Sequence, residues 1–355
     1  MTETAVVYSP KYLGHKTAPR HPESPSRLRV IMRELNKSGI LKNERCSLVE
    51  PETSDIHILN LVHETQYIQR IKQFCVCGGG LLDQGDTVVS DESYEVARLA
   101  VGGTVKAVDL VMAKKCRNSF AFVRPPGHHA GSDYPMGFCV FNNIAVAAAY
   151  LLENFSLNRV LILDIDAHHG NGTQEIFYRS NRVLYISLHE DPSEFPLTGF
   201  AEEIGEDEGL GYTVNIPLPY GTDEKIYLRA FTEVVAPIIN QYQPQFILVS
   251  TGFDDHYTDP VGNLSLSAFS YAKIFDTILD LAAKFCQGKM VAVLEGGYSL
   301  RFLGKMACAV IAKMAEISYT VKDKHHSAGI KVQKRAEKTL NQIKKIQSSF
   351  WDIKH

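Results

Sequence analysis

The chain has 355 residues, of which 45% are hydrophobic, and this is enough for one large α/β domain or two small ones. The formal net charge of -3 gives no reason to expect general binding to nucleic acid. No apolar run approaches the roughly 20 residues that cross a bilayer, and we see no secretory signal, so we do not expect a membrane protein. The seven cysteines include no CxxC pair, so we expect a reduced, cytoplasmic protein.

Short apolar runs recur along the chain and alternate with longer segments of helical periodicity. We expect strands at Ala5–Tyr8, Phe120–Val123, Val160–Leu163, Val183–Leu188, Phe246–Ser250 and Met290–Leu294. The helices expected between them are Ser93–Lys115, Ile144–Glu153, Ile226–Tyr242 and Ala268–Cys286. Strands that alternate with helices predict βαβ units and a mainly parallel sheet that is covered on both faces. Sheets of this kind bind ligands at the carboxyl ends of their strands.

The composition changes near the end of the chain, which becomes rich in lysine after about residue 320. We therefore expect a main domain at residues 1–320 and a basic extension at residues 321–355. Apolar residues of the extension fall at helical spacing, at Val332, Ala336, Leu340, Ile343 and Phe350. They predict a helix that docks on the body of its own chain; a basic face for nucleic acid or a partner is the alternative.

Four of the expected strands lead directly into polar residues. The four segments are Arg124-Pro-Pro-Gly-His128-His129, Asp164-Ile-Asp166-Ala-His168, Gly252-Phe-Asp254-Asp255 and Glu295-Gly-Gly-Tyr298. Because the carboxyl ends of parallel strands lie at one edge of a sheet, we expect these segments to form a single site.

The second segment has the composition of a metal site. Side chains alternate along an extended chain, so Asp164, Asp166 and His168 would project to one side. Burying two carboxylates together is costly unless a cation neutralises them. We predict that Asp166, His168 and Asp254 bind a divalent metal such as zinc and leave a position open for water, as catalytic sites do. The alternatives are a solvated polar turn and, for Asp254, a loop acid or helix cap.

The tandem histidines supply proton transfer. His128 or His129 could take a proton from an attacking water and return it to a leaving amine. Asp164 and Asn171 are available to orient the two rings, and a carboxylate raises imidazole basicity more than an amide does. The two histidines could therefore differ in protonation at pH 7. A surface histidine pair or a second metal site is the alternative.

Two further groups of residues fit a carbonyl substrate. The Tyr298 phenol could donate a hydrogen bond to a developing oxyanion, although a buried tyrosine can also serve only the core. Gly137, Phe138 and Phe195 could form aromatic walls around a narrow aliphatic chain, although phenylalanines more often belong to a core.

These motifs, in this order, resemble the histone deacetylase superfamily, which includes acetoin-utilization proteins and acetylpolyamine amidohydrolases. The similarity covers roughly residues 5–315. It is carried by His21-Pro-Glu-Ser-Pro-Ser-Arg27, Arg124-Pro-Pro-Gly-His-His-Ala130, Gly137-Phe-Cys-Val-Phe-Asn-Asn143, Asp164-Ile-Asp-Ala-His-His-Gly-Asn-Gly-Thr-Gln174, Gly252-Phe-Asp254 with Asp259-Pro260, and Glu295-Gly-Gly-Tyr298.

The resemblance implies an arginase/deacetylase α/β fold, which is a single mostly parallel eight-stranded sheet with helices on both faces. It also implies hydrolysis of an acetamide that depends on one Zn2+ per chain, with Fe2+ or Co2+ as possible substitutes. By motif position, the metal ligands would be Asp166, His168 and Asp254, and the catalytic residues would be His128, His129, Tyr298, Asp164 and Asn171. Substrate would be bound by Asp86 at the rim and by Gly137, Phe138, Phe195 and Val261, with Arg27 in an internal cavity behind the site.

Structural potassium ions are also implied by the resemblance. One set of residues would be Asp164, Asp166, His168, Ser187 and Leu188. A second set, which contains no carboxylate, would be Phe177, Ser180, Val183 and Tyr212.

Several positions subdivide or depart from the family pattern. Asn171 stands where class I enzymes carry Asp, which places the sequence nearer the class II and prokaryotic branch. Tyr298 is retained, whereas weakly active class IIa enzymes have His. The rim sequence Phe195-Pro-Leu-Thr-Gly199 departs from the common pattern. Val261 stands where a polyamine-specific relative has Glu, so this position offers a cationic polyamine tail no charge.

The leading hypothesis is therefore a deacetylase that acts on N-acetyl-lysine in proteins or peptides, or on a related small acetylated amine. An acetylpolyamine or other small-molecule amidohydrolase is the nearest alternative. A ureohydrolase of the arginase type is disfavoured by the tandem histidines and Tyr298. A non-enzymatic acyl-lysine or nucleic-acid binding module predicts loss of the tyrosine or of a ligand, and neither is lost.

Overall fold

The computed structural model describes residues 2–353, and eight parallel strands form its central sheet. The strand order is β2-β1-β5-β10-β9-β6-β7-β8, and each neighbouring pair runs parallel. The strands are β1 (Thr2–Val7), β2 (Cys46–Val49), β5 (Cys116–Ala121), β6 (Val160–Asp164), β7 (Val183–Glu190), β8 (Thr213–Leu218), β9 (Phe246–Thr251) and β10 (Met290–Leu294). This confirms the expected sheet.

A strand is present at each of the six expected places, although β5 begins four residues before and ends two residues before the expected Phe120–Val123. In the middle of the sheet, β6, β9 and β10 are buried throughout. Their near-continuous apolar runs are typical of parallel strands covered on both faces. The two strands of this sheet that the sequence did not reveal are its edge strands. β2 is short and partly exposed, and β8 contains Pro217, which an edge strand can accommodate because one side needs no ladder hydrogen bond.

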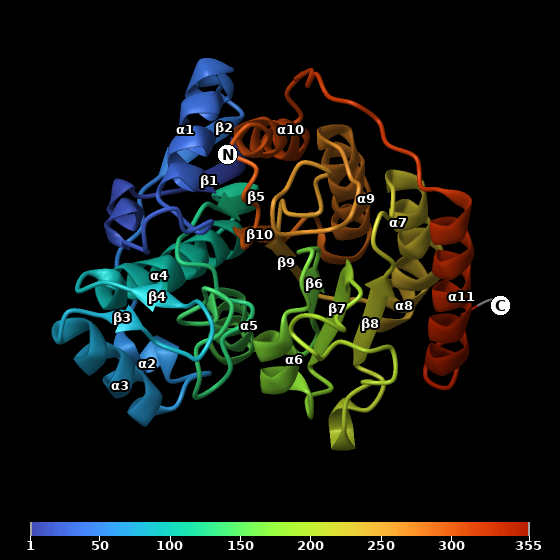
Figure 1. Cartoon of the computed structure of the whole chain (residues 1–355), viewed down its shortest axis with the longest axis horizontal. Coiled ribbons are helices and arrows are strands. Elements are labelled where there is room, and N and C mark those ends of the chain that lie inside the picture. The colour runs from blue at the N-terminus through green and yellow to red at the C-terminus, as the bar shows by residue number, and fades with distance from the viewer. Residues whose placement is uncertain (1, 354–355) are drawn as a thin grey trace.

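Helices cover both faces of the sheet (Figure 1). One face carries α1 (Ser26–Lys37), α10 (Leu303–Met314), α9 (Ala268–Cys286), α7 (Glu224–Ala230) and α8 (Ala236–Tyr242). The other carries α4 (Ser93–Met112), α5 (Asn143–Asn154) and α6 (Asn171–Phe177), and α3 (Thr65–Val76) and α2 (Ile56–Leu59) pack on α4 and α5 respectively.

The expected helix Ile226–Tyr242 is interrupted in the structure. A π-helical turn, Phe231–Val235, separates α7 from α8. Pro237 stands at the start of α8, where its missing N–H removes one hydrogen bond of a continuous α-helix. The other three expected helices are present, and α9 has the predicted bounds.

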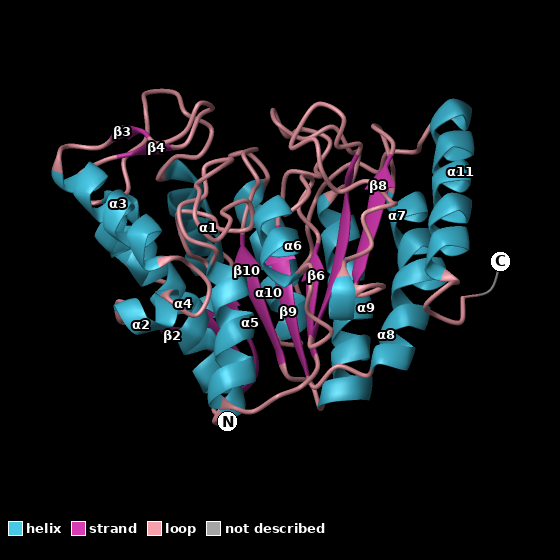
Figure 2. Cartoon of the chain, turned by 90° about the horizontal axis from the view of Figure 1, so that it is seen from below, coloured by secondary structure: helices cyan, strands magenta, loops and turns pink. Residues whose placement is uncertain are grey.

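The loops that follow the strands gather along one edge of the sheet, at the top of Figure 2. A small antiparallel ribbon, β3 (Gly80–Leu81) with β4 (Val88–Val89), lies among them and carries Asp86 in its connection. Among the described residues, no helix is long and apolar enough to cross a membrane.

The C-terminal helix α11 (Ile330–Gln347) packs beside β8 and α7 at the edge of the molecule (Figure 1). It buries Ala336, Leu340 and Ile343, as the apolar spacing predicts, whereas Phe350 lies beyond the end of the helix. Lys344 is also buried, and its Nζ lies 2.9 Å from Glu233 Oε2. The basic extension therefore docks on its own chain; its last two residues lie outside the described part.

One side chain ties the connection between α10 and α11 to the loop after β9. Asp323 accepts hydrogen bonds from the Ala268 N–H (2.7 Å) and the Tyr257 hydroxyl (2.9 Å), and its Oδ2 lies 2.9 Å from His256 Nε2. The side chains of Asp323 and His256 are both fully buried. Because His256 stands two residues after Asp254, this contact fixes the loop that carries the expected metal ligand.

Candidate active site

The four polar segments predicted from the sequence meet at one place because β5, β10, β9 and β6 are consecutive in the sheet. Each segment begins at the carboxyl end of one of these strands. Parallel neighbours bring those ends together, although the segments lie far apart in the sequence.

The expected metal ligands form one compact cluster. Asp166, His168 and Asp254 each offer a ligand atom, and these atoms all lie within 4.8 Å of one another. His168 Nδ1 lies 3.3 Å from Asp166 Oδ1 and 3.1 Å from Asp254 Oδ2. Both carboxylates are buried, and two carboxylates with one imidazole are a common donor set for zinc and similar metals. The residues therefore fit a divalent cation.

Two glycines leave room for these carboxylates. A Cβ at Gly252 or at Gly296 would collide with oxygens of Asp166 and Asp254. The Gly296 N–H donates to Asp166 Oδ2 at 2.7 Å, so the backbone also orients that ligand. Glycine at these two positions therefore allows the backbone to lie close to the two carboxylates.

The tandem histidines have partners of different charge. His128 Nδ1 lies 3.1 Å from Asp164 Oδ2, and His129 Nδ1 lies 2.8 Å from Asn171 Oδ1. Burial opposes protonation of His128, but Asp164 and Asp166 outweigh it and raise the pKa of His128 to about 10. Burial and the neighbouring charge of His128 hold the pKa of His129 well below its ordinary value. At neutral pH the pair is one imidazolium and one neutral imidazole.

The hydrogen bond to Asn171 also selects the tautomer of His129. The Asn171 amide NH2 group is directed at the His129 carbonyl oxygen and the Tyr134 hydroxyl, both at 3.3 Å. Its Oδ1 must therefore accept from His129, so that Nδ1 carries the proton and Nε2 is free to accept another.

Tyr298 is held in place by Asp259 and Arg27. Its N–H donates to Asp259 Oδ2 at 2.6 Å, and the guanidinium carbon of Arg27 lies 4.8 Å from the centroid of its ring. Burial raises the pKa of the Tyr298 phenol well above its usual range, although Arg27 opposes the shift. The phenol therefore keeps its proton at neutral pH and can donate a hydrogen bond.

Part of this site lines a pocket of about 300 Å³. All five expected substrate-binding residues belong to its wall, together with His129, His168 and Tyr298; the five are Asp86, Gly137, Phe138, Phe195 and Val261. The Phe138 ring packs edge-on against Tyr298, with centroids 5.8 Å apart, and the Phe195 ring packs against His129 at 5.1 Å. A narrow aliphatic chain fits between such walls.

Arg27 packs against the ring of Tyr298, and the internal cavity expected around it stays a prediction. Its side chain is buried and donates to the backbone carbonyls of Gly297 (2.7 Å) and Glu295 (2.5 Å). Glu23 neutralises this charge at 3.3 Å and also pairs with Arg124 at 2.6 Å.

Comparison with known proteins identifies this arrangement. A model of the histone deacetylase domain matches residues 21–314. The chain is 40% identical to a probable deacetylase of Archaeoglobus fulgidus over 98% of both chains, and 39% identical to a histone deacetylase-like amidohydrolase of Pseudomonas aeruginosa over 85% of this chain and 79% of the other. The crystal structure of the HDA15 HD domain superposes with a TM-score of 0.88 at 35% identity, covering 99% of this chain and 95% of that one. The chain belongs to the histone deacetylase family.

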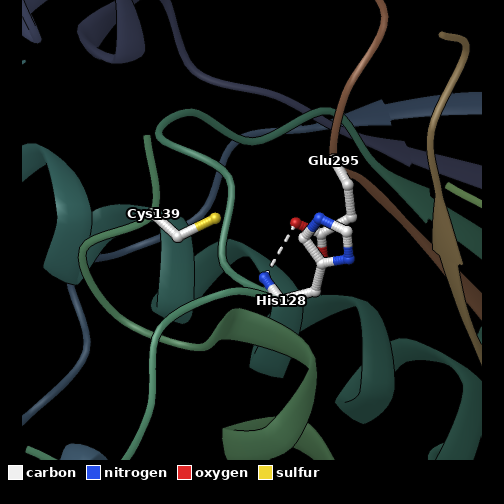
Figure 3. Close-up of side chains that lie close together, drawn as sticks. All are labelled: His128, Cys139 and Glu295. Atoms are coloured by element: carbon white, nitrogen blue, oxygen red, sulfur yellow. Dashed lines mark hydrogen bonds between the residues drawn. The ribbon is translucent and has the colours of Figure 1, made fainter. Parts of the chain in front are cut away.

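Sequence reasoning gave no role to Glu295, which supports the histidine turn of this histone deacetylase family member. Its buried carboxylate accepts the His128 N–H at 3.2 Å (Figure 3). It also accepts the Gly127 N–H (2.7 Å) and the Ser250 hydroxyl (3.1 Å). Burial raises the pKa of Glu295 to about 7, although His128 opposes the shift. Its place directly after a strand was a signal that could have identified it.

Figure 3 also shows Cys139 near His128 and Glu295, and the ligand atoms of these three residues lie within 4.8 Å of one another. Burial raises the pKa of the Cys139 thiol well above its usual range, and the negative charge of Glu295 adds to the shift. The sequence motif and the paired buried carboxylates favour the Asp166 cluster as the metal site, and that assignment stays a prediction.

The residues of the two expected potassium sites lie in two regions. Asp164 and Ser187 are register partners on β6 and β7. Phe177 ends α6, Val183 begins β7, and Tyr212 directly precedes β8. Potassium binding at either place stays a prediction.

Proposed function

We propose that this family member is a zinc-dependent deacetylase that hydrolyses the acetamide of N-acetyl-lysine in proteins or of a related small N-acetyl amine. Asp166, His168 and Asp254 would hold one Zn2+ per chain, with Fe2+ or Co2+ as possible substitutes. The proposal is carried by one observation: His168 of the metal-ligand cluster, His129 with its lowered pKa and the protonated Tyr298 line one pocket, and His128 lies directly behind His129.

A metal bound here would lower the pKa of a coordinated water and polarise the substrate carbonyl. The neutral His129 has the free Nε2 and would take a proton from the attacking water. It would then return that proton to the nitrogen of the leaving amine. Its hydrogen bond to Asn171 keeps the ring in the required tautomer.

The other residues of the site would stabilise charge and position the substrate. His128 stays protonated beside Asp164, so its role would be electrostatic rather than that of a base. The Tyr298 phenol would donate a hydrogen bond to the carbonyl oxygen as negative charge develops there. Phe138 and Phe195 would align the aliphatic chain, and Asp86 would contact the substrate at the rim.

Several finer features belong to the same proposal. The partner is an acetylated protein, peptide or small amine. We further propose that residues 1–320 form the catalytic domain, that residues 321–355 form a basic extension, and that the protein acts in the cytoplasm. Structural K+ would bind at the two sets of residues implied by the family resemblance.

The test is an assay of the metal-loaded enzyme against acetyl-lysine peptides, acetylated polyamines and longer acyl-lysines. Tyr298→Phe should lower kcat about 100-fold to 1000-fold, since one donor to the oxyanion is removed. Tyr150→Phe on α5, outside the pocket wall, is the matched control and should keep the wild-type rate. Hydrolysis of none of these substrates, or full activity of Tyr298→Phe, would overturn the proposal.

A further inference from the structure

The side-chain amide of Asn171 is held by groups that lie outside the substrate pocket. Its Nδ2 lies 3.3 Å from the Tyr134 hydroxyl and 3.3 Å from the His129 carbonyl oxygen, while its Oδ1 lies 2.8 Å from His129 Nδ1. An amide keeps nearly the same shape after a half-turn that exchanges its oxygen and nitrogen, so its partners decide which atom faces the histidine. The partners of Tyr134 therefore bear on the tautomer of His129.

Tyr134 has a single phenol proton, and a carboxylate takes it. The Tyr134 hydroxyl donates to Glu175 Oε2 on α6 at 2.7 Å. Burial raises the pKa of the Tyr134 phenol, and the hydrogen bond to Glu175 adds to the shift, so the phenol keeps this proton at neutral pH. Because the proton points to Glu175, the hydroxyl oxygen can only accept a hydrogen bond from Asn171. That bond requires the NH2 group of the amide and leaves Oδ1 for His129.

The local backbone places the Tyr134 ring against the turn that follows the two histidines. A Cβ at Gly131 would collide with this ring, so glycine leaves the room that the ring occupies. The Gly131 N–H donates to the Tyr134 carbonyl oxygen at 3.0 Å, and the Ser132 hydroxyl lies 3.4 Å from Glu175 Oε1. The segment 131–134 is therefore fixed both to itself and to α6.

These groups belong to a second pocket, of about 510 Å³, which meets the substrate pocket at one hydrogen bond. Asn171, Tyr134 and Glu175 line the second pocket, whereas His129 lines the substrate pocket. The hydrogen bond from His129 to Asn171 joins the two walls. Tyr134 and Glu175 therefore lie outside the space that the substrate would fill, so their replacement should leave the substrate contacts unchanged.

We propose that Tyr134 is a positioning residue, and that the chain Glu175–Tyr134–Asn171 fixes the amide orientation that leaves His129 Nε2 free to accept a proton. This inference rests on the proposed deacetylase function, in which His129 is the base. With the amide turned over, its NH2 group would donate to His129 Nδ1 and the single ring proton would move to Nε2. The ring could then accept no proton from the attacking water.

The first test removes the phenol oxygen and keeps the ring. On a substrate that the wild type hydrolyses, Tyr134→Phe should lower kcat about threefold to tenfold, which is the factor that one neutral hydrogen bond supplies, and change KM by less than about twofold. Tyr178→Phe is the matched control and should keep the wild-type kcat. Tyr178 lines the same second pocket but is not one of the described partners of the Asn171 amide.

Variants of Glu175 test the outer end of the chain. Glu175→Ala should lower kcat by a similar factor, because the Tyr134 proton is then free to point to Asn171 and to stabilise the turned amide. Glu175→Gln should keep most of the activity, since its side-chain oxygen can still accept the phenol proton. Equal kcat losses in the two variants would contradict the proposed chain. Glu175 is exposed, so these variants remain informative even if Tyr134→Phe does not fold.

Two measurements separate positioning from a merely structural role. Nitrogen chemical shifts of His129 in the metal-loaded enzyme, assigned with His129→Gln, should show the proton on Nδ1 in the wild type and partly on Nε2 in Tyr134→Phe. In Asn171→Ala no amide remains to be oriented, so Tyr134→Phe should lower kcat no further in that background. The same loss of kcat in both backgrounds, or a Nδ1 proton retained throughout in Tyr134→Phe, would overturn the inference.

The failure of this inference is distinguishable from the failure of the proposed function. If the wild type hydrolyses no acetylated amine, the deacetylase function is overturned. The tautomer of His129 does not depend on turnover, so its measurement still decides whether Tyr134 orients Asn171. If the wild type is active and Tyr134→Phe keeps the full kcat, the function stands and the positioning role is overturned.

Discussion

The ring centroids of His128 and His129 lie 4.0 Å apart, and the two rings are held in opposite protonation states. The carboxylate of Asp164 favours the imidazolium of His128. The imidazolium in turn disfavours a second positive charge on His129, whose own partner is only the Asn171 amide. The side chains of Asp164 and Asn171 therefore decide which histidine of the pair is protonated and which is neutral.

Asn171→Asp should move the acidic limb of the pH profile of kcat/KM to higher pH. A carboxylate beside His129 Nδ1 favours the protonated ring and raises the pKa of His129. Because the base is active only when neutral, activity would be lost at a higher pH than in the wild type, by about one pH unit or more. Asn154→Asp at the exposed end of α5 is the control. An unchanged acidic limb would show that His129 is not the base.

Glu23→Gln should destabilise the fold by about 3–5 kcal/mol at pH 7, because two buried guanidinium groups would lose their counter-charge. Glu23 is fully buried and lies 2.6 Å from Arg124 and 3.3 Å from Arg27. Urea unfolding measures the change. Glu44→Gln, an exposed acid, is the control and should shift stability by less than about 0.5 kcal/mol. A loss below about 1 kcal/mol would contradict the role given to this carboxylate.

The Glu23 carboxylate should also make the stability of the fold sensitive to acid. Burial alone would raise the pKa of Glu23, but Arg124, His15 and Arg27 outweigh burial and lower the pKa from 4.5 to about 2. A pKa depressed by folding contributes stability above pH 4.5 that is lost as the pH falls toward 2. The contribution is about 3 kcal/mol. Urea unfolding between pH 2 and 5 should show this loss in the wild type, and a flatter dependence in Glu23→Gln would assign it to Glu23.

Asp323→Ala should destabilise the protein by about 2–4 kcal/mol, because it leaves the Ala268 N–H, the Tyr257 hydroxyl and the His256 ring without their acceptor. Faster hydrogen exchange at the start of α9 would accompany the loss. Asp280→Asn, at an exposed position of the same helix, should have little effect. Unchanged stability and exchange would show that residues 315–329 do not hold the loop after β9.

Chelation should lower the melting temperature of the wild type by several degrees, since a metal that binds only the folded state stabilises it. Without the cation, the buried carboxylates of Asp166 and Asp254 repel each other. Elemental analysis should find about one metal per wild-type chain and far less in Asp254→Asn. The melting temperature of that variant should be insensitive to chelator. A wild type without bound metal after loading would contradict the assigned ligand set.

The sequence by itself determined the central strands and the chemistry at their ends. Apolar runs such as Val160–Leu163 and Met290–Leu294 are long enough to predict buried strands, and the polar residues directly after them predict the site. These signals are local, because strand propensity and the spacing of ligands along one segment do not depend on the rest of the fold. The edge strand β8 was missed for the same reason: Asn215 and Pro217 weaken its local signal, and its stability comes from pairing with β7.

Only the tertiary structure decided which of the remaining charged residues lie in the pocket wall or make long-range contacts. Glu190 follows a predicted strand just as Glu295 does, but its position in the pocket wall depends on the path of the loop after β7 and on Asn263, which is 73 residues away in the sequence. Likewise, Asp323 reaches His256 only because α10 and α9 pack together on one face of the sheet. The physical reason is that these hydrogen bonds and ion pairs join segments that are distant in the sequence. Strand order and helix packing bring such segments together, and neither can be predicted from the local sequence.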